Sequence, residues 1–90
     1  MDRRIKIRGK YWRLKTSKLT HPGECQAPWK KRKKILISKE LESGSLIELD
    51  TVLHELLHAA MWDVSEETIR ESATSIAKVL FDLGARLDLR

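Results

Sequence analysis

Two histidines separated by three residues, with a glutamate directly after the first, form the most chemically informative group in this chain of 90 residues. The group is His54-Glu55-Leu56-Leu57-His58. On a helix the two imidazoles lie one turn apart on the same face, where two neutral ring nitrogens can bind one Zn²⁺. The glutamate is then placed to act as general base toward a zinc-bound water. The residues therefore predict a small zinc hydrolase that attacks an amide carbonyl.

A third protein ligand is needed, because tetrahedral zinc at a catalytic site takes three side chains and leaves the fourth position to water. The candidates downstream of the pentapeptide are Asp63, Glu66, Glu67 and Glu71. A helical wheel places Glu66 within about 50° of the centre of the apolar face of its helix, and places Glu67 and Glu71 nearly opposite. We predict Glu66 as the third ligand. Asp63 is the second choice, because a sharp turn could fold it back under the metal.

Several other residues are candidates for supporting roles. Asp50 precedes His54 by one turn and could hold the second ring nitrogen, although a carboxylate in mid-helix is more often solvated or ion-paired. Cys25 could be a ligand, but its isolation favours a buried or loop thiol. A donor to the oxyanion is also expected. Its candidates, which the sequence does not rank, are His21, Tyr11 and Arg70.

Other interpretations of the metal residues stay open. The histidines could be two partly buried helix residues, with Glu55 an exposed carboxylate. The site could also bind zinc for structure alone, although two histidines and one carboxylate usually leave a coordination position open. Glu66 could act only as a carboxylate that stabilises the positive N-terminal end of its helix.

The helix that must carry the histidines has a clear start. Ser45 and Glu48 match a capping box, which predicts that the helix begins one residue after the serine. Apolar residues then recur at helical spacing and predict a buried stripe, which the histidines flank. Glu55 lies further round the helix, so we expect the ligands at the edge of the core and the base facing solvent. The stripe comprises Leu46, Leu49, Leu53, Leu56, Leu57 and Ala60.

A second helix should follow after a short interruption at Trp62-Asp63-Val64. Ser65 can cap it, Glu66 and Glu67 suit its positive end, and Gly84 is placed to end it. Because the connection is short, the two helices must pack side by side, with the start of the second near the end of the first. The predicted buried face comprises Ile69, Ala73, Ile76, Ala77, Leu80 and Leu83.

The first half of the chain predicts a small sheet. Ile5 to Arg8 and Tyr11 to Lys15 alternate apolar and charged residues around a turn at Gly9-Lys10, which predicts a hairpin. Thr20 to Pro28 is predicted as a loop, and Ile35 to Ser38 as a strand. We therefore expect an α+β fold in which about three strands, antiparallel or mixed, pack on the metal-binding helix, followed by a second helix.

Composition agrees with one globular domain spanning residues 1–90. Hydrophobic residues make up 41% and charged residues 34% of the chain, which argues against disorder. The single cysteine excludes an intrachain disulfide and fits a reducing cytoplasm. The basic N-terminus is followed by no apolar run of signal-peptide or membrane-spanning length, so we expect neither secretion nor a membrane partner. The oligomeric state is left open.

The net charge of +5 is concentrated in the first forty residues and could attract a nucleic acid or an acidic protein. Trp29 could stack on a base while the five cations after it contact phosphates. We favour a solvated loop or a blunted sheet edge, because no known nucleic-acid motif surrounds the run. These cations are Lys30, Lys31, Arg32, Lys33 and Lys34.

The pentapeptide, the short turn and the helix bearing Glu66 together resemble the zincin metallopeptidases, in particular the gluzincin-like branch with a carboxylate third ligand. Within that group the chain is similar to small zincin-like proteins of tailed bacteriophages, over about the last two-thirds of its length. The resemblance implies a minimal zincin fold, a sheet edge that aligns an extended peptide, and action inside a bacterial host. It implies His54 and His58 as ligands and Glu55 as base, and does not extend to Glu66. The shared positions are Gly23, Cys25, the stretch Leu49 to Ala59 and the stretch Ile76 to Leu80.

The metal helix is also shared with intracellular zincins that act on DNA-crosslinked proteins or on repressors. The chain is too short for their accessory modules, so we expect a peptide or protein substrate of unspecified sequence. The competing hypothesis is a nucleic-acid- or protein-binding module with a structural or vestigial zinc site.

Overall fold

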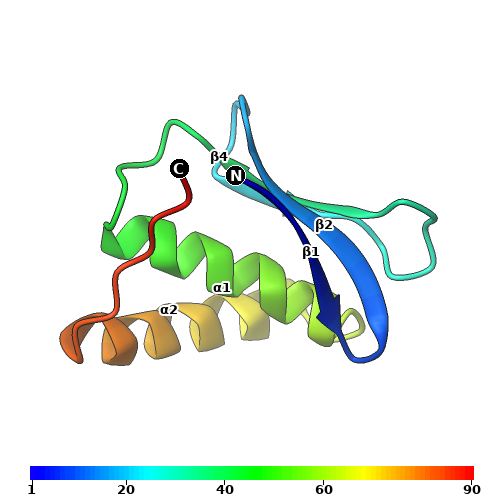
Figure 1. Cartoon of the computed structure of the whole chain (residues 1–90). Helices are drawn as coiled ribbons and strands as arrows, with labels where there is room; N and C mark the ends of the chain where they lie inside the picture. The colour runs from blue at the N-terminus through cyan, green and yellow to red at the C-terminus, as the bar shows by residue number, and fades with distance from the viewer.

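A computed structural model describes all residues from Met1 to Arg90 and shows an α+β fold, as predicted. Four strands form one sheet, and two consecutive helices lie on one side of it (Figure 1). The helix α1 lies between the sheet and α2, which packs mainly on α1. The elements are β1 (Asp2–Ile7), β2 (Lys10–Ser17), β3 (Gly23–Cys25), β4 (Lys34–Ser38), α1 (Leu46–Ala60) and α2 (Glu66–Asp82).

The sheet is mixed, with the strand order β1-β2-β4-β3. The predicted hairpin is confirmed as the antiparallel pair of β1 and β2, whereas β2 and β4 run parallel. The tight turn lies one residue earlier than predicted, at Arg8 and Gly9, with φ angles of 49° and 79°. Two positive φ values in succession match the twist of a two-residue hairpin, and glycine adopts such a value without steric cost.

The prediction of about three strands is wrong by one, because β3 forms inside the segment predicted as a loop. This strand has only three residues and follows a proline, so it carries no alternating pattern. Its pairing is supplied by β4: Pro22 accepts a backbone hydrogen bond from Ser38 at 2.7 Å, and Gln26 donates one to Lys34 at 3.0 Å. Tertiary pairing therefore creates this strand where local sequence does not predict one.

The predicted start of α1 is confirmed. The Ser45 hydroxyl accepts from the Glu48 backbone N–H at 3.1 Å, and the Glu48 carboxylate accepts from the Gly44 N–H at 3.0 Å. The predicted buried stripe is only partly correct, because of its members Leu49 alone is fully buried. The helix is covered by the sheet on one side and by α2 on the other, so its buried residues lie further toward the sheet than the predicted stripe does. The buried residues of α1 are Glu48, Leu49, Val52, Glu55 and Ala59.

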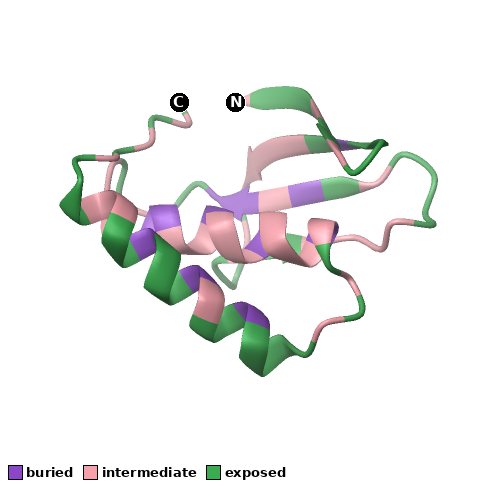
Figure 2. Cartoon of the chain, turned by 90° about the horizontal axis from the view of Figure 1, so that it is seen from below, coloured by how far each residue is buried: buried purple, intermediate pink, exposed green.

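Helix α2 begins at Glu66 after the predicted cap, since the Ser65 hydroxyl accepts from the Thr68 N–H at 3.2 Å. Three small or branched residues, Ile69, Ala73 and Ala77, form its buried face. The prediction that Ile76 and Leu83 also belong to this buried face is wrong, because both are exposed. Only α1 covers α2, as the outward-facing exposed residues in Figure 2 show. Neither helix has the length and apolarity needed to cross a membrane.

Candidate metal centre

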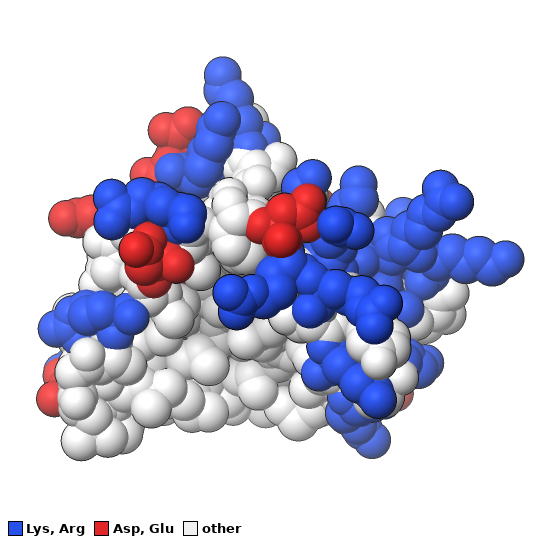
Figure 3. Space-filling model, in the orientation of Figure 1, with Lys and Arg blue, Asp and Glu red and all other residues white.

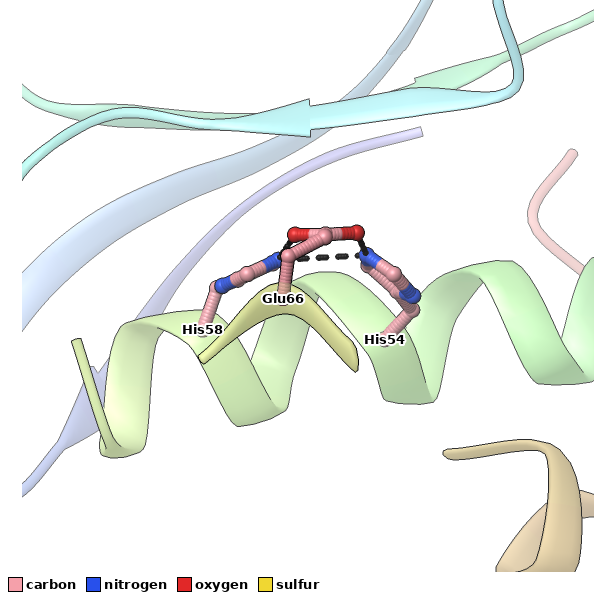
Figure 4. A group of neighbouring side chains, drawn as sticks. All are labelled: His54, His58 and Glu66. Carbon is pink, nitrogen blue, oxygen red and sulfur yellow. Dashed lines mark hydrogen bonds and ion pairs between the residues drawn. The ribbon is translucent and has the colours of Figure 1, made fainter. Parts of the chain in front are cut away.

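Three potential ligand atoms converge at one point beside α1 (Figure 4). The His54 Nε2 lies 2.9 Å from one carboxylate oxygen of Glu66, and the His58 Nε2 lies 2.6 Å from the other. The two ring nitrogens are 3.1 Å apart. The structure thus brings together the two predicted histidines and the predicted third ligand.

Local structure explains this convergence. His54 and His58 are one turn apart in α1 and project from the same side. The chain turns sharply after α1, where the Met61 N–H closes the helix on the Leu57 carbonyl at 2.8 Å. Because Ser65 caps the next helix, Glu66 occupies its first position, next to the end of α1.

The donor set and its spacing suit a small divalent cation. Ligand atoms about 2.0–2.1 Å from a tetrahedral zinc ion lie about 3.3 Å from one another, close to the spacing found here. Two imidazole nitrogens and a carboxylate are ligands that zinc prefers. The same contacts form without a metal if each ring donates an Nε2 proton to Glu66, so metal content is the measurement that distinguishes the two states. The Glu66 side chain is 55% exposed, which leaves one side of the group open.

The second-choice ligand, Asp63, does not join this group. It lines a separate hollow with Arg8 and Trp62. Asp50 accepts a hydrogen bond from the Thr74 hydroxyl at 3.0 Å, and no hydrogen bond joins it to a histidine ring. Cys25 also lies outside the group, and burial, with repulsion from Glu55, raises the pKa of its thiol to about 12.

Glu55 faces the sheet, and the expectation that it faces solvent is wrong. The residue is 7% exposed and lies under β3, where its Cγ would be 3.1 Å from a Cβ placed on Gly23. Burial, together with repulsion from the carboxylates of Glu66 and Glu24, raises the pKa of Glu55 to about 7. Sequence spacing gave the direction of Glu55 relative to the histidines but not which neighbour would cover it. The one feature of the sequence that could have indicated β3 as this neighbour was the absence of a side chain at Gly23, which allows a close approach of another residue.

His54 and Glu55 line one cavity of about 410 Å³. Arg70, from α2, lines the same cavity and is the one candidate oxyanion donor placed there. His21 lies near Glu24, with its Nε2 3.8 Å from the carboxylate. Tyr11 lines a different cavity on the sheet.

One tryptophan lies beside the centre and a second packs against the first, an arrangement that the sequence did not indicate. The ring of Trp62 lies 6.4 Å from that of His58 and 5.7 Å from that of Trp29. Trp29 is 73% exposed. Trp12, in contrast, is buried in the core.

No family model, no curated protein and no solved structure matches this chain.

Proposed function

We propose that the chain is a zinc-dependent peptidase of the zincin type, which hydrolyses peptide bonds with Glu55 as general base. One observation carries the proposal: two imidazole nitrogens and a carboxylate meet beside a cavity that also holds a buried carboxylate. His54 and Glu55 both line that cavity, so a substrate entering it would meet the ligand face and the base together.

Zn²⁺ held by His54, His58 and Glu66 would supply a Lewis acid that polarises the substrate carbonyl and acidifies a water. Glu55 has a pKa near 7, so at neutral pH its carboxylate can take a proton from the attacking water and return it to the leaving amine. Arg70 lines the cavity and would donate hydrogen bonds to the oxyanion.

The edge strand β3 is the proposed site for the substrate backbone. Pro22 and Gln26 hydrogen-bond to β4, so by alternation the backbone groups of Gly23 and Cys25 face the open edge. An extended peptide can add there as a further strand. Because Gly23 lies over Glu55, the peptide would run next to the base.

Zinc content and turnover test the proposal separately. We expect one zinc per chain by inductively coupled plasma mass spectrometry, lost in His58→Ala. We expect hydrolysis of a labelled peptide library to stop with a chelator and to resume with zinc. Glu55→Gln should keep the metal and lose about 10²- to 10⁴-fold in rate. Equal zinc in wild type and His58→Ala would refute the centre, and undiminished hydrolysis by Glu55→Gln would refute the base.

A second candidate function is a nucleic-acid- or protein-binding module with a structural or vestigial zinc site. A cavity lined by five cations, separate from the metal centre, favours it. Binding that survives chelation, with no hydrolysis by the zinc-loaded protein, would support this candidate over the peptidase. For either function we propose the cytoplasm of a phage-infected bacterium, on the basis of the resemblance and the single cysteine.

A further inference from the structure

The face of the sheet that points away from the helices carries a row of cations. Trp12 and Ile35 point into the core, so their sequence neighbours face outward. On this face Arg4 pairs with Arg13 across β1 and β2, and Arg13 pairs with Lys34 across β2 and β4. Three positive side chains therefore lie directly beside one another on neighbouring strands.

Such a row is unfavourable for the fold, because like charges directly opposite on neighbouring strands repel. Of the three cations, only Arg13 pairs with a carboxylate: its Nε lies 2.7 Å from Oδ1 of Asp2. Residues 1–40 hold 14 of the 18 Lys and Arg residues but three of the 13 Asp and Glu residues. Figure 3 shows Lys and Arg gathered over the sheet, whereas the surface over the helices is mostly white. The excess positive charge is thus confined to one part of the molecule.

An open cavity of about 600 Å³ continues this row. Five cations and two aromatic residues line it, with no carboxylate among them. Arg32 and Lys33 add to the row from the loop before β4, and Arg32 has a φ of 52°, a conformation that favours glycine. Tyr11 is 45% exposed, with the guanidinium of Arg4 4.1 Å from the centre of its ring. The cavity therefore combines concentrated positive charge with an accessible planar ring.

We propose that this cationic face binds single-stranded nucleic acid. Its cations neutralise phosphates, and the exposed ring of Tyr11 gives an unpaired base a surface for stacking. A lipid surface fits less well, because no exposed aliphatic side chain lines the cavity. This binding does not depend on the metal centre, because none of the three metal-centre residues lines the cationic cavity. The face comprises Arg4, Tyr11, Arg13, Arg32, Lys33 and Lys34.

Fluorescence anisotropy of a labelled oligothymidylate, measured over a series of salt concentrations with chelated protein, tests the proposal. Each phosphate contact on a single strand contributes about 0.7 to the slope of log affinity against log salt, so Arg4→Ala/Lys34→Ala should lower the slope by about 1.4. Tyr11→Ala should weaken binding at least about fivefold. The control Lys39→Ala/Lys78→Ala removes the same charge outside the face and should leave the slope unchanged.

Several results would overturn the proposal. The first is that the oligothymidylate does not bind at low salt, and the second is that the control pair lowers the slope as much as Arg4→Ala/Lys34→Ala does. The third is that a duplex binds as tightly as the single strand. The fourth is that phosphatidylserine vesicles or polyglutamate, at equal charge concentration, displace the oligothymidylate. Thermal unfolding of each variant checks the fold. If the alanine pair unfolds, Arg4→Gln/Lys34→Gln keeps the side-chain stems and gives the same readout.

Discussion

Removing the Glu55 carboxylate should stabilise the metal-free protein at alkaline pH. The side chain is 7% exposed, and burial, with repulsion from Glu66 and Glu24, raises its pKa from the ordinary 4.5 to about 7. A carboxyl whose pKa is higher in the folded than in the unfolded state stabilises the fold while it is protonated. That stabilisation is complete below pH 4.5 and is lost as the pH rises through about 7.

The size of the effect follows from the pKa. A rise of about 2.5 in the pKa corresponds to about 3 kcal/mol. The carboxylate borders an open cavity, and screening by solvent there reduces the expected effect to about 2 kcal/mol. Glu55→Gln cannot ionise, so its free energy of unfolding relative to wild type should rise by about 2 kcal/mol between about pH 4.5 and about pH 8.

Urea unfolding of chelated protein, followed by tryptophan fluorescence at several pH values, measures this difference. Groups that do not interact with Glu55 titrate alike in both proteins and cancel in the comparison. Glu71→Gln removes an exposed carboxylate of α2 and should change stability equally at every pH. A stability difference between wild type and Glu55→Gln that does not change between about pH 4.5 and about pH 8 would refute the argument from burial.

Four further predictions concern the centre and its supports. Zinc at about 100 times its dissociation constant should stabilise wild type by about 2.7 kcal/mol but not His58→Ala, as measured by thermal unfolding with and without metal. Ser65→Ala should cost about 1 kcal/mol in urea unfolding and weaken zinc binding in a competitive chelator titration, because the cap fixes the residue that follows it. Gly23→Ala should cost about 1–3 kcal/mol in urea unfolding, because the new Cβ would lie 3.1 Å from the Leu36 carbonyl oxygen. Cys25, with a pKa raised from 9.0 to about 12, should react with iodoacetamide about a thousandfold more slowly in the folded than in the urea-unfolded protein at about pH 8, as followed by mass spectrometry.

The sequence was most informative where a structural signal is local. Both helix starts follow from a serine cap and the residues of the next turn, and both are observed. Glu66 could be selected from the sequence because the cap sets the angular position of each residue on α2. The geometry of α1 and the short connection then leave little freedom in how the two helix ends meet.

The arrangement around the base could not be predicted in the same way. β3 has three residues and depends on β4 for its hydrogen bonds, so nothing local distinguishes it from a loop. The direction of Glu55 relative to the histidines followed from the helix, but which side of α1 the sheet covers is a tertiary choice. The cationic face likewise required the register of three strands, since Arg4, Arg13 and Lys34 are distant in sequence.

Helix geometry links the metal ligands to the position of the base. Successive residues of an α-helix point about 100° apart, so Glu55 cannot share the face of His54 and must project toward a neighbouring surface. In this fold α2 covers one side of α1, and the sheet covers the other. Glu55 therefore lies beneath β3 with a raised pKa, while the ligands stay at the open side with Glu66. The shortest strand of the sheet thus sets the environment of the base, and the connection between the helices sets that of the metal ligands.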